Sequence, residues 1–166
     1  MMARDVRFEP VTPENIGRYS VFDGRLGELS SYQSRIYPGN REEYISLRNC
    51  GLLCWAYIIS DGVTAGAVWL EKASPEDRFA VLGIFLADDG FRGKGLGRLA
   101  ICAYISRNAE KLNIDRVVLN VRKANSRAVR CYLACGFTVT GEYVTQKGIP
   151  ALKMEKLLSE EVELCL

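Results

Sequence analysis

The residues best suited to chemistry form a glycine-rich segment, Gly90-Phe-Arg-Gly-Lys-Gly-Leu-Gly97, which follows an apolar run. A long helical pattern starts near its last glycine. When glycines join a strand directly to a helix, several backbone N–H groups lack intrahelical partners, and the positive end of the helix dipole points at the same place. The segment therefore predicts an anion site, for which a phosphate or pyrophosphate is the usual occupant.

Two nucleotide-binding motifs compete for these glycines, and both fit poorly. Gly95-Leu-Gly97-Arg-Leu-Ala100 matches the dinucleotide pattern G-x-G-x-x-G/A, and Asp115 follows near the distance expected for a ribose contact. In that motif the acid ends a strand, whereas Asp115 precedes the predicted strand over residues 116–121. The ATP-type loop needs Ser or Thr after its lysine, and Lys94 is followed by Gly95.

The elements that must position this loop are predicted from periodicity and turn signals. The predicted strands cover residues 6–9, 52–60, 64–72, 79–87, 116–121, 137–143 and 149–157, and the predicted helices begin at residues 12, 40, 96 and 126. Residues 19–39 read either as an irregular helix pair or as a loop over a cleft. Antiparallel hairpins at both ends and a strand-helix-strand crossover between them imply a mixed sheet in a single α+β domain over residues 1–166.

Composition excludes several classes of function. The chain has 22 Lys and Arg against 20 Asp and Glu, so its net charge of +2 creates no field that would favour nucleic acid or an anionic membrane. No apolar run approaches the roughly 20 residues that span a bilayer, and the N-terminus has no signal-peptide pattern, so a cytoplasmic location is expected. The absence of histidine removes the commonest general base and metal ligand.

Six cysteines include two Cys-x3-Cys pairs, Cys50 with Cys54 and Cys131 with Cys135. This spacing is wider than that of zinc knuckles. We interpret the cysteines as small buried thiols in a reducing compartment, with metal or disulfide chemistry as the alternative.

A downstream segment, Leu119-Asn-Val-Arg-Lys-Ala-Asn125-Ser-Arg-Ala-Val-Arg-Cys-Tyr132-Leu-Ala-Cys-Gly136-Phe137, adds a second motif to Arg92-Gly-Lys-Gly95-Leu-Gly97. Together they resemble the GNAT superfamily of acyl-CoA-dependent N-acyltransferases, with its R-x-x-G-x-G pyrophosphate loop and its strand-Asn-helix-Tyr-x-x-x-Gly-Phe segment. The detailed resemblance covers residues 79–137, and the element order extends it over the chain. It implies a mixed, mostly antiparallel central sheet of about six or seven strands, flanked by about four helices, with a splayed central strand pair.

The resemblance also implies a binding site for acetyl-CoA, the acetyl donor, without a metal. Backbone N–H groups of the loop would hold the CoA pyrophosphate, and a backbone N–H of the preceding strand could stabilise the oxyanion. The implied cofactor-binding residues are Phe85, Leu86, Ala87, Arg92, Gly93, Lys94, Gly95, Leu96, Gly97, Arg98 and Asn125. Other interpretations of these residues stay open. Lys94 and Arg98 could be solvated surface residues, Phe85, Leu86 and Ala87 could be strand core, and Asn125 could be a helix N-cap.

Tyr132 matches the family's tyrosine that protonates the leaving CoA thiolate, although its position in an apolar helical stripe also fits a core tyrosine. The general base is not assigned. Many relatives carry a glutamate where this chain has Gly83, and Glu71, Asp88 and Glu142 are weak alternatives at strand ends. A water chain, or an acceptor amine of low pKa, would need no dedicated base.

The function predicted from the resemblance is that of an N-acetyltransferase, which moves the acetyl group of acetyl-CoA directly to an amine of a small molecule or peptide. A catalytically silent acyl-CoA-binding sensor or interaction module is the alternative. The expected partners are the amine acceptor and, as an option, a second copy of the chain in a homodimer. Acceptor specificity should come from residues 16–49 and 143–150, whose composition does not identify the acceptor.

Overall fold

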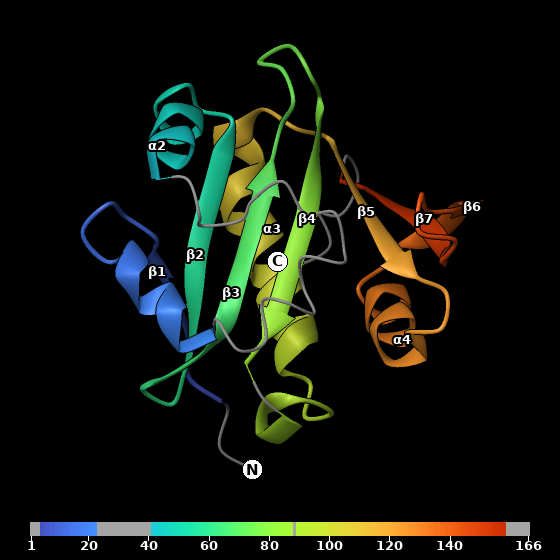
Figure 1. The fold of residues 1–166 in the computed structure, drawn as a ribbon, viewed down its shortest axis with the longest axis horizontal. Helices are drawn as coiled ribbons and strands as arrows, with labels where there is room; N and C mark the ends of the chain where they lie inside the picture. The colour runs from blue at the N-terminus through green and yellow to red at the C-terminus, as the bar shows by residue number, and fades with distance from the viewer. Residues whose placement is uncertain (1–3, 23–40, 88, 159–166) are drawn as a thin grey trace, which may run out of the picture.

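The computed structural model describes residues 4–22, 41–87 and 89–158, and its core is one seven-stranded sheet (Figure 1). The strand order is β1-β2-β3-β4-β5-β7-β6, and every neighbouring pair is antiparallel except β4 with β5. The strands are β1 (Val6–Pro10), β2 (Leu53–Ser60), β3 (Val63–Glu71), β4 (Phe79–Leu86), β5 (Arg116–Arg122), β6 (Thr138–Val144) and β7 (Pro150–Leu157). This confirms the predicted mixed, mostly antiparallel sheet.

The described helices are fewer than the four expected. They are the α-helices α2 (Arg41–Asn49), α3 (Leu96–Leu112) and α4 (Ser126–Ala134), and the 3-10 helices η1 (Ile16–Phe22) and η3 (Asp89–Phe91). None of them has the length and apolar character needed to cross a membrane.

The α-helix predicted to begin at Thr12 is wrong in the described part of that segment. The Thr12 N–H donates to Asn15 Oδ1 at 2.7 Å, and the Asn15 side chain also donates to the carbonyl oxygen of Pro10 at 2.9 Å. These bonds close a turn, and a 3-10 helix follows it. Residues 23–39, the rest of the segment left open between helices and a loop, lie outside the described residues.

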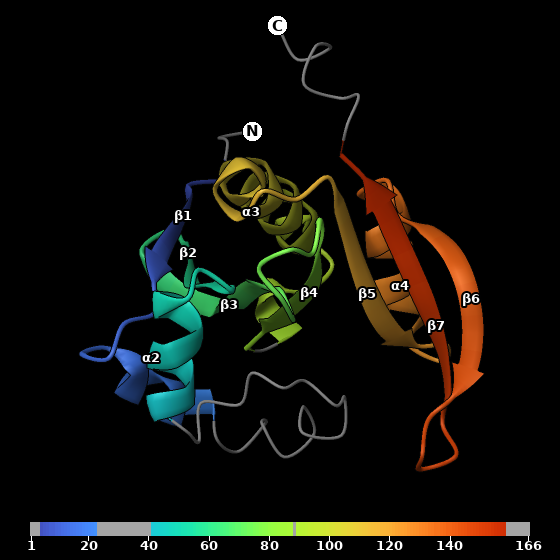
Figure 2. The same cartoon turned by 90° about the horizontal axis from the view of Figure 1, so that it is seen from above.

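The two faces of the sheet carry separate apolar cores (Figure 2). On one face α3 and α4 pack against the sheet, and buried residues of α3 such as Leu96, Ala100 and Ile101 form the centre of this core. On the other face η1 and α2 cover a cluster that is mainly aromatic. The cluster consists of Val11, Tyr19, Phe22, Tyr44, Leu53, Trp55, Tyr57, Ala67, Trp69 and Phe85.

The two central strands separate along their length (Figure 1). β4 and β5 pair in parallel only at Phe79 with Arg116, Ala80 with Val117 and Val81 with Val118. β4 nevertheless continues to Leu86 and stays paired with β3 along its other edge. The sheet is therefore open between β4 and β5 at the end where β4 leads into the glycine-rich loop.

Candidate active site

The glycine-rich loop leads into the N-terminus of α3, which has no side-chain cap. Gly95 is the N-cap of α3, has φ of 78°, and provides no side-chain cap. The first N–H groups of an α-helix have no intrahelical acceptor, so the amides of Leu96, Gly97 and Arg98 are available to an external one. Leu96 anchors this arrangement because its side chain is fully buried in the core. The local geometry is that of an anion cradle.

Three cationic side chains accompany the cradle, and all are exposed. The Arg92 guanidinium donates a hydrogen bond to the carbonyl oxygen of Leu86 at 3.4 Å, so it lies across the end of β4. The charge of Arg98 acts on the thiol of Cys131 in α4, which places this arginine toward α4. Lys94 lies between two glycines on the exposed loop.

The backbone groups on one edge of β4 face β3, and those on the other edge face the opening of the sheet. The Ala87 N–H donates to the carbonyl oxygen of Ala65 in β3 at 2.7 Å, whereas the carbonyl oxygen of Leu86 accepts from Arg92 on the other side. Because successive residues of a strand direct their N–H and C=O groups to alternate edges, Ile84 faces the same side as Leu86. Of the three strand residues predicted to lie beside a thioester, Phe85 and Ala87 face β3 and Leu86 faces the opening.

The start and end of α4 are fixed by local bonds. Asn125 is its N-cap, and its side-chain oxygen accepts from the Ala128 N–H at 3.3 Å. At the other end Gly136 has φ of 90°, and the Phe137 N–H donates to the carbonyl oxygen of Tyr132 at 3.1 Å. This is the predicted Schellman-type stop. It places the Phe137 ring edge-on to Tyr132, at 6.0 Å between ring centroids.

Tertiary packing brings α4 to the glycine-rich loop. A Cβ built on Gly97 would lie 3.5 Å from Sγ of Cys131, the residue immediately before Tyr132. The Tyr132 side chain is half-buried against the core formed with α3. The structure thus brings together the loop, the open edge of β4 and α4, which come from separate parts of the chain.

Cys131 has an unusual environment that the sequence did not reveal. A hydrogen bond from the Cys135 thiol, helped by the charge of Arg98, lowers the pKa of Cys131 to about 7, and the same bond together with burial raises that of Cys135. The described cysteines are free thiols. Cys50 is exposed, which corrects the interpretation of the cysteines as buried. Within the described ranges, no group of three metal-ligating side chains is gathered.

Gly83 lies against an indole ring. Its partner across the β3–β4 ladder is Trp69, and a Cβ at position 83 would lie only 2.0 Å from Cε2 of that ring. The ring therefore occupies the space that a side chain at this position would need.

The alternative bases are poorly placed. Glu71 pairs with Val81, five residues before Leu86, which is about 17 Å along the strand. Glu142 forms an ion pair with Lys123 at 2.8 Å, and both side chains are more than half exposed. Asp88 lies outside the described residues.

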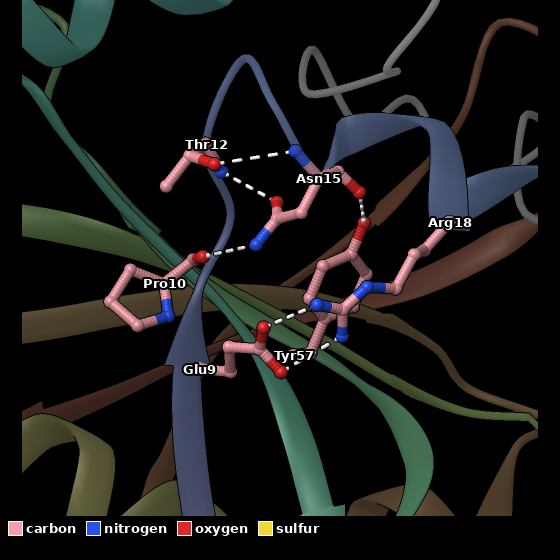
Figure 3. Close-up of polar contacts among 6 residues, drawn as sticks. All are labelled: Glu9, Pro10, Thr12, Asn15, Arg18 and Tyr57. Carbon is pink, nitrogen blue, oxygen red and sulfur yellow. Dashed lines mark hydrogen bonds and ion pairs between the residues drawn. The ribbon is translucent and has the colours of Figure 1, made fainter.

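A polar network fastens η1 over the aromatic face (Figure 3). The Tyr57 hydroxyl donates to the carbonyl oxygen of Asn15 at 2.8 Å, and burial raises the pKa of Tyr57 to about 12, so the phenol stays protonated. The Arg18 guanidinium donates to Glu9 at 2.8 Å and lies 5.4 Å from the Tyr57 ring centroid. Sequence reasoning missed this network, because its members come from β1, the following turn, η1 and β2.

Comparisons with known proteins identify the family of this chain. Residues 6–138 match the family model of the acetyltransferase (GNAT) domain. A spermine/spermidine N(1)-acetyltransferase of Bacillus subtilis is 32% identical over 77 residues, which are 46% of this chain and 43% of that protein. The aligned part is thus less than half of the curated relative.

Solved structures resemble the fold over nearly the whole chain. The spermidine N-acetyltransferase of Vibrio cholerae, solved with CoA and spermine, has a TM-score of 0.71 at 20% identity and covers 93% of this chain and 96% of its own. Aminoglycoside acetyltransferase AAC(6')-Ib, solved with coenzyme A and kanamycin, has a TM-score of 0.70 at 20% identity, with 92% and 95% covered. A ribosomal L7/L12 alpha-N-protein acetyltransferase, solved with CoA, reaches 0.74 at 17% identity, with 92% and 94% covered. Since the family model spans most of the sequence and these structures share its fold, the chain belongs to the GNAT acetyltransferase family.

Proposed function

We propose that this protein is an acetyl-CoA-dependent N-acetyltransferase that transfers the acetyl group directly to an amine of a small molecule or peptide, within a single domain over residues 1–166. The observation that carries the proposal is the opening of the sheet between β4 and β5 beside the uncapped N-terminus of α3. The opening exposes backbone groups of β4, and the helix terminus exposes amides suited to a pyrophosphate. Acetyl-CoA has chemical groups for both.

In this proposal the loop binds the pyrophosphate. The amides from Gly93 to Arg98 donate to it, and Arg92, Lys94 and Arg98 supply positive charge. Gly95 keeps the left-handed conformation that directs the chain into α3. Asn125 already caps α4 through its side-chain oxygen, so a contact with CoA would use its side-chain nitrogen.

The pantetheine arm would lie along the open edge of β4 like an added strand. Ile84 and Leu86 face this edge, so their N–H groups are the donors that could stabilise the oxyanion formed when the amine attacks the thioester carbonyl. Phe85 and Ala87 would contribute through their side chains on the aromatic face, where Phe85 is buried. The oxyanion role thus falls on Leu86 or Ile84.

Tyr132 would donate its phenolic proton to sulfur as the C–S bond breaks, and the CoA thiol then leaves. The attacking nitrogen must lose a proton, and position 83 provides no carboxylate for this step. We infer that water accepts that proton, since Glu71 and Glu142 lie in other surroundings. No covalent acetyl-enzyme is required.

The acceptor is an amine in this proposal, and the relatives suggest where a search should begin. The Bacillus subtilis protein is named for spermine and spermidine, and the solved structures include complexes with spermine and kanamycin. A panel of spermine, spermidine, kanamycin and a short peptide with a free N-terminus covers these classes.

Replacement of Tyr132 by Phe tests the catalytic proposal. We expect kcat for thiol release from acetyl-CoA in the presence of an acceptor to fall about 100-fold, as is typical for loss of a general acid, while CoA affinity measured by calorimetry stays unchanged. Thiol release that is independent of Tyr132 would contradict its role. CoA binding without any acceptor-dependent release would favour the silent acyl-CoA-binding module instead.

Gly97→Ala tests the binding site separately. Its Cβ would make only an ordinary 3.5 Å contact with Cys131, so the fold should survive while the surface at the cradle is filled. We expect CoA affinity to fall about tenfold or more. Gly141→Ala is the matched control, because a Cβ there meets nothing within 4 Å. Equal CoA affinity in both variants would contradict the proposed pyrophosphate site.

A further inference from the structure

A cavity of about 440 Å³ lies at the outer edge of the sheet, beyond the end of β1. β1 pairs with β2 up to Pro10 and Ala56, and the Val11 N–H still donates to the carbonyl oxygen of Trp55 at 2.9 Å, so the edge of β2 at Leu53 and Cys54 extends past that pairing. α2 and α3 lie on opposite faces of the sheet (Figure 2). Both contribute walls to the cavity at this edge. Its volume falls within the range of small-molecule sites.

The cavity is remote from the proposed acetyl-transfer site. Its α3 residues run from Tyr104 to Leu112, about 12 to 24 Å along the helix from Leu96 and the glycine-rich loop. Its β2 residues pair with the end of β3 that contains Glu71, and Glu71 pairs in turn with the start of β4. The sheet is open at the other end of β4, so the cavity is a second location rather than an extension of the first.

Three cationic side chains line the cavity, and the carboxylate of Glu14 acts electrostatically on Tyr44, another of its residues. Arg48 from α2 and Arg107 and Lys111 from α3 line it, and no Asp or Glu does. In the part of the chain that the structure describes, none of the three forms an ion pair with a carboxylate. The Arg107 guanidinium is held over the ring of Phe8, 5.1 Å from its centroid, so it is already oriented toward this edge.

Two buried phenols provide further donors. Tyr44 and Tyr104 are only 5% and 4% exposed, and both line the cavity. Neither hydroxyl has a hydrogen-bond partner among the described residues, yet neither oxygen is fully enclosed by the protein, so each can bond to a molecule in the cavity. Burial raises the pKa of both tyrosines, so at neutral pH both remain protonated and can donate.

The remaining walls are mainly apolar, with Phe8, Val11, Leu53, Trp55 and Leu112 among them. An inorganic ion would leave this surface in contact with water, whereas an organic molecule with one anionic end would cover it. Guanidinium groups pair well with carboxylate and phosphate oxygens, often through two hydrogen bonds at once.

We propose that this cavity binds a small organic anion, whose carboxylate or phosphate group contacts Arg48, Arg107 and Lys111 and whose apolar part lies against Phe8 and Leu53. Bound there, the anion would connect α2 with α3 across the edge of the sheet. The inference rests on the cavity itself and does not depend on acetyl transfer.

The test is calorimetric titration of the full chain with phenyl phosphate and with benzoate, which present the two anionic groups on similar apolar bodies. Benzyl alcohol serves as the neutral probe. We expect at least one anion to bind more tightly than benzyl alcohol, and the tighter of the two identifies the preferred group. Binding should persist in the presence of CoA, because the cavity lies away from the glycine-rich loop.

Variants locate the binding. Arg107→Gln and Lys111→Gln should each raise Kd about tenfold, the effect of one lost charge-assisted contact. Tyr104→Phe should raise Kd about three- to tenfold through loss of one hydrogen bond. Lys147→Gln, at an exposed turn, is the matched control and should leave Kd within about twofold. Arg107 and Lys111 are exposed, so their variants should keep the wild-type melting temperature.

Three results would overturn the proposal. The first is binding of benzyl alcohol as tight as that of either anion, and the second is an unchanged Kd in both Arg107→Gln and Lys111→Gln. The third is the absence of anion binding up to about 10 mM, a concentration at which even a Kd of 1 mM would be visible. None of these results bears on CoA binding or Tyr132, so failure here is distinguishable from failure of the proposed enzyme activity.

Discussion

Gly83 has only a hydrogen atom in the place where the side chain of any other residue would meet the indole of Trp69. The nearest ring atoms would lie 2.0 to 2.3 Å from a Cβ, well inside contact distance. Gly83 is therefore required by packing on the aromatic face. The pair also explains why this strand carries no carboxylate, since the tryptophan fills the space that a glutamate would use.

Gly83→Ala tests this packing. We expect it to lower the free energy of unfolding by about 2 kcal/mol or more, because overpacked cores typically cost about 1 to 3 kcal/mol. Gly141→Ala, also in a strand but with open space around it, should change the unfolding free energy by less than about 0.5 kcal/mol. Urea unfolding of both variants measures the difference, and equal values would contradict the steric argument. Adding Trp69→Ala should remove the extra cost of Gly83→Ala.

Cys131 should be the reactive thiol of α4. Its pKa is lowered to about 7, first by the hydrogen bond from Cys135 and also by Arg98, so the nucleophilic thiolate forms near neutral pH. Labelling with iodoacetamide, followed peptide by peptide with mass spectrometry, should therefore reach half its maximal rate near pH 7. In Cys135→Ala the midpoint should move up toward the ordinary thiol value, because the hydrogen bond is lost.

Two observations would argue against this account of Cys131. One is a labelling midpoint near pH 9 in the unmodified chain, and the other is a midpoint unaffected by Cys135→Ala. Because Sγ lies 3.5 Å from the Cβ position of Gly97, CoA at the cradle should also slow the labelling.

At the scale of elements, β4 is the strand on which the proposed site depends. One edge is paired with β3 from Val81 to Leu86, while the other is paired with β5 only up to Val81. The strand can therefore be stable in the sheet and still offer backbone groups to a ligand. Because the backbone groups of successive residues point to alternate edges, one residue of β4 pairs with β3 and the next is available to a ligand.

Hydrogen exchange of the β4 amides measures this division. Without CoA, the amides of Ile84 and Leu86 should exchange faster than those of Phe85 and Ala87, which face β3. With CoA bound, exchange at Ile84 and Leu86 should slow by about tenfold or more, with little change at the other two. NMR-detected exchange resolves single residues. Equal protection of all four amides without CoA would contradict the open edge.

At the scale of the whole molecule, a buried lysine fastens the end of the sheet that lies away from the glycine-rich loop. Lys72 is only 4% exposed, and its Nζ donates to the carbonyl oxygen of Leu112 at 2.8 Å and to that of Pro75 at 3.1 Å. The Leu112 carbonyl belongs to the last turn of α3, where carbonyl groups lack intrahelical donors and a positive charge is favourable. Lys72 thus joins the β3–β4 connection to α3.

Lys72→Met should lower the free energy of unfolding by about 1 to 3 kcal/mol, because it leaves the buried carbonyl group of Leu112 without its donor and also removes the partly buried bond to Pro75. The control Lys147→Met, at an exposed position, should stay within about 0.5 kcal/mol of the unmodified chain. Urea unfolding of both variants is the measurement. A loss no greater than in the control would show that the buried ammonium adds no net stability.

The sequence alone determined the features that depend on neighbouring residues. The strand order along the chain, the glycine-rich entry to α3 and the stop at Gly136 were predicted, since each follows from propensity and hydrogen bonds within a few residues. The cap at Asn125, which the structure shows, was one of two roles left open for that residue. The same local reasoning failed at Thr12. There the side chain of Asn15 forms hydrogen bonds with backbone groups, and a turn followed by η1 stands in place of the expected α-helix.

Only the tertiary structure decided what depends on residues far apart in the chain. The extent of pairing between β4 and β5, the indole of Trp69 against Gly83 and the thiol of Cys131 beside Gly97 all arise from contacts across elements. The cavity at the β2 edge likewise combines α2, β2 and α3. Periodicity assigns a residue to a face but not to a partner, because the partner is selected by packing of the whole sheet and its helices. The sequence therefore predicted the anion cradle, and the structure decided which groups surround it.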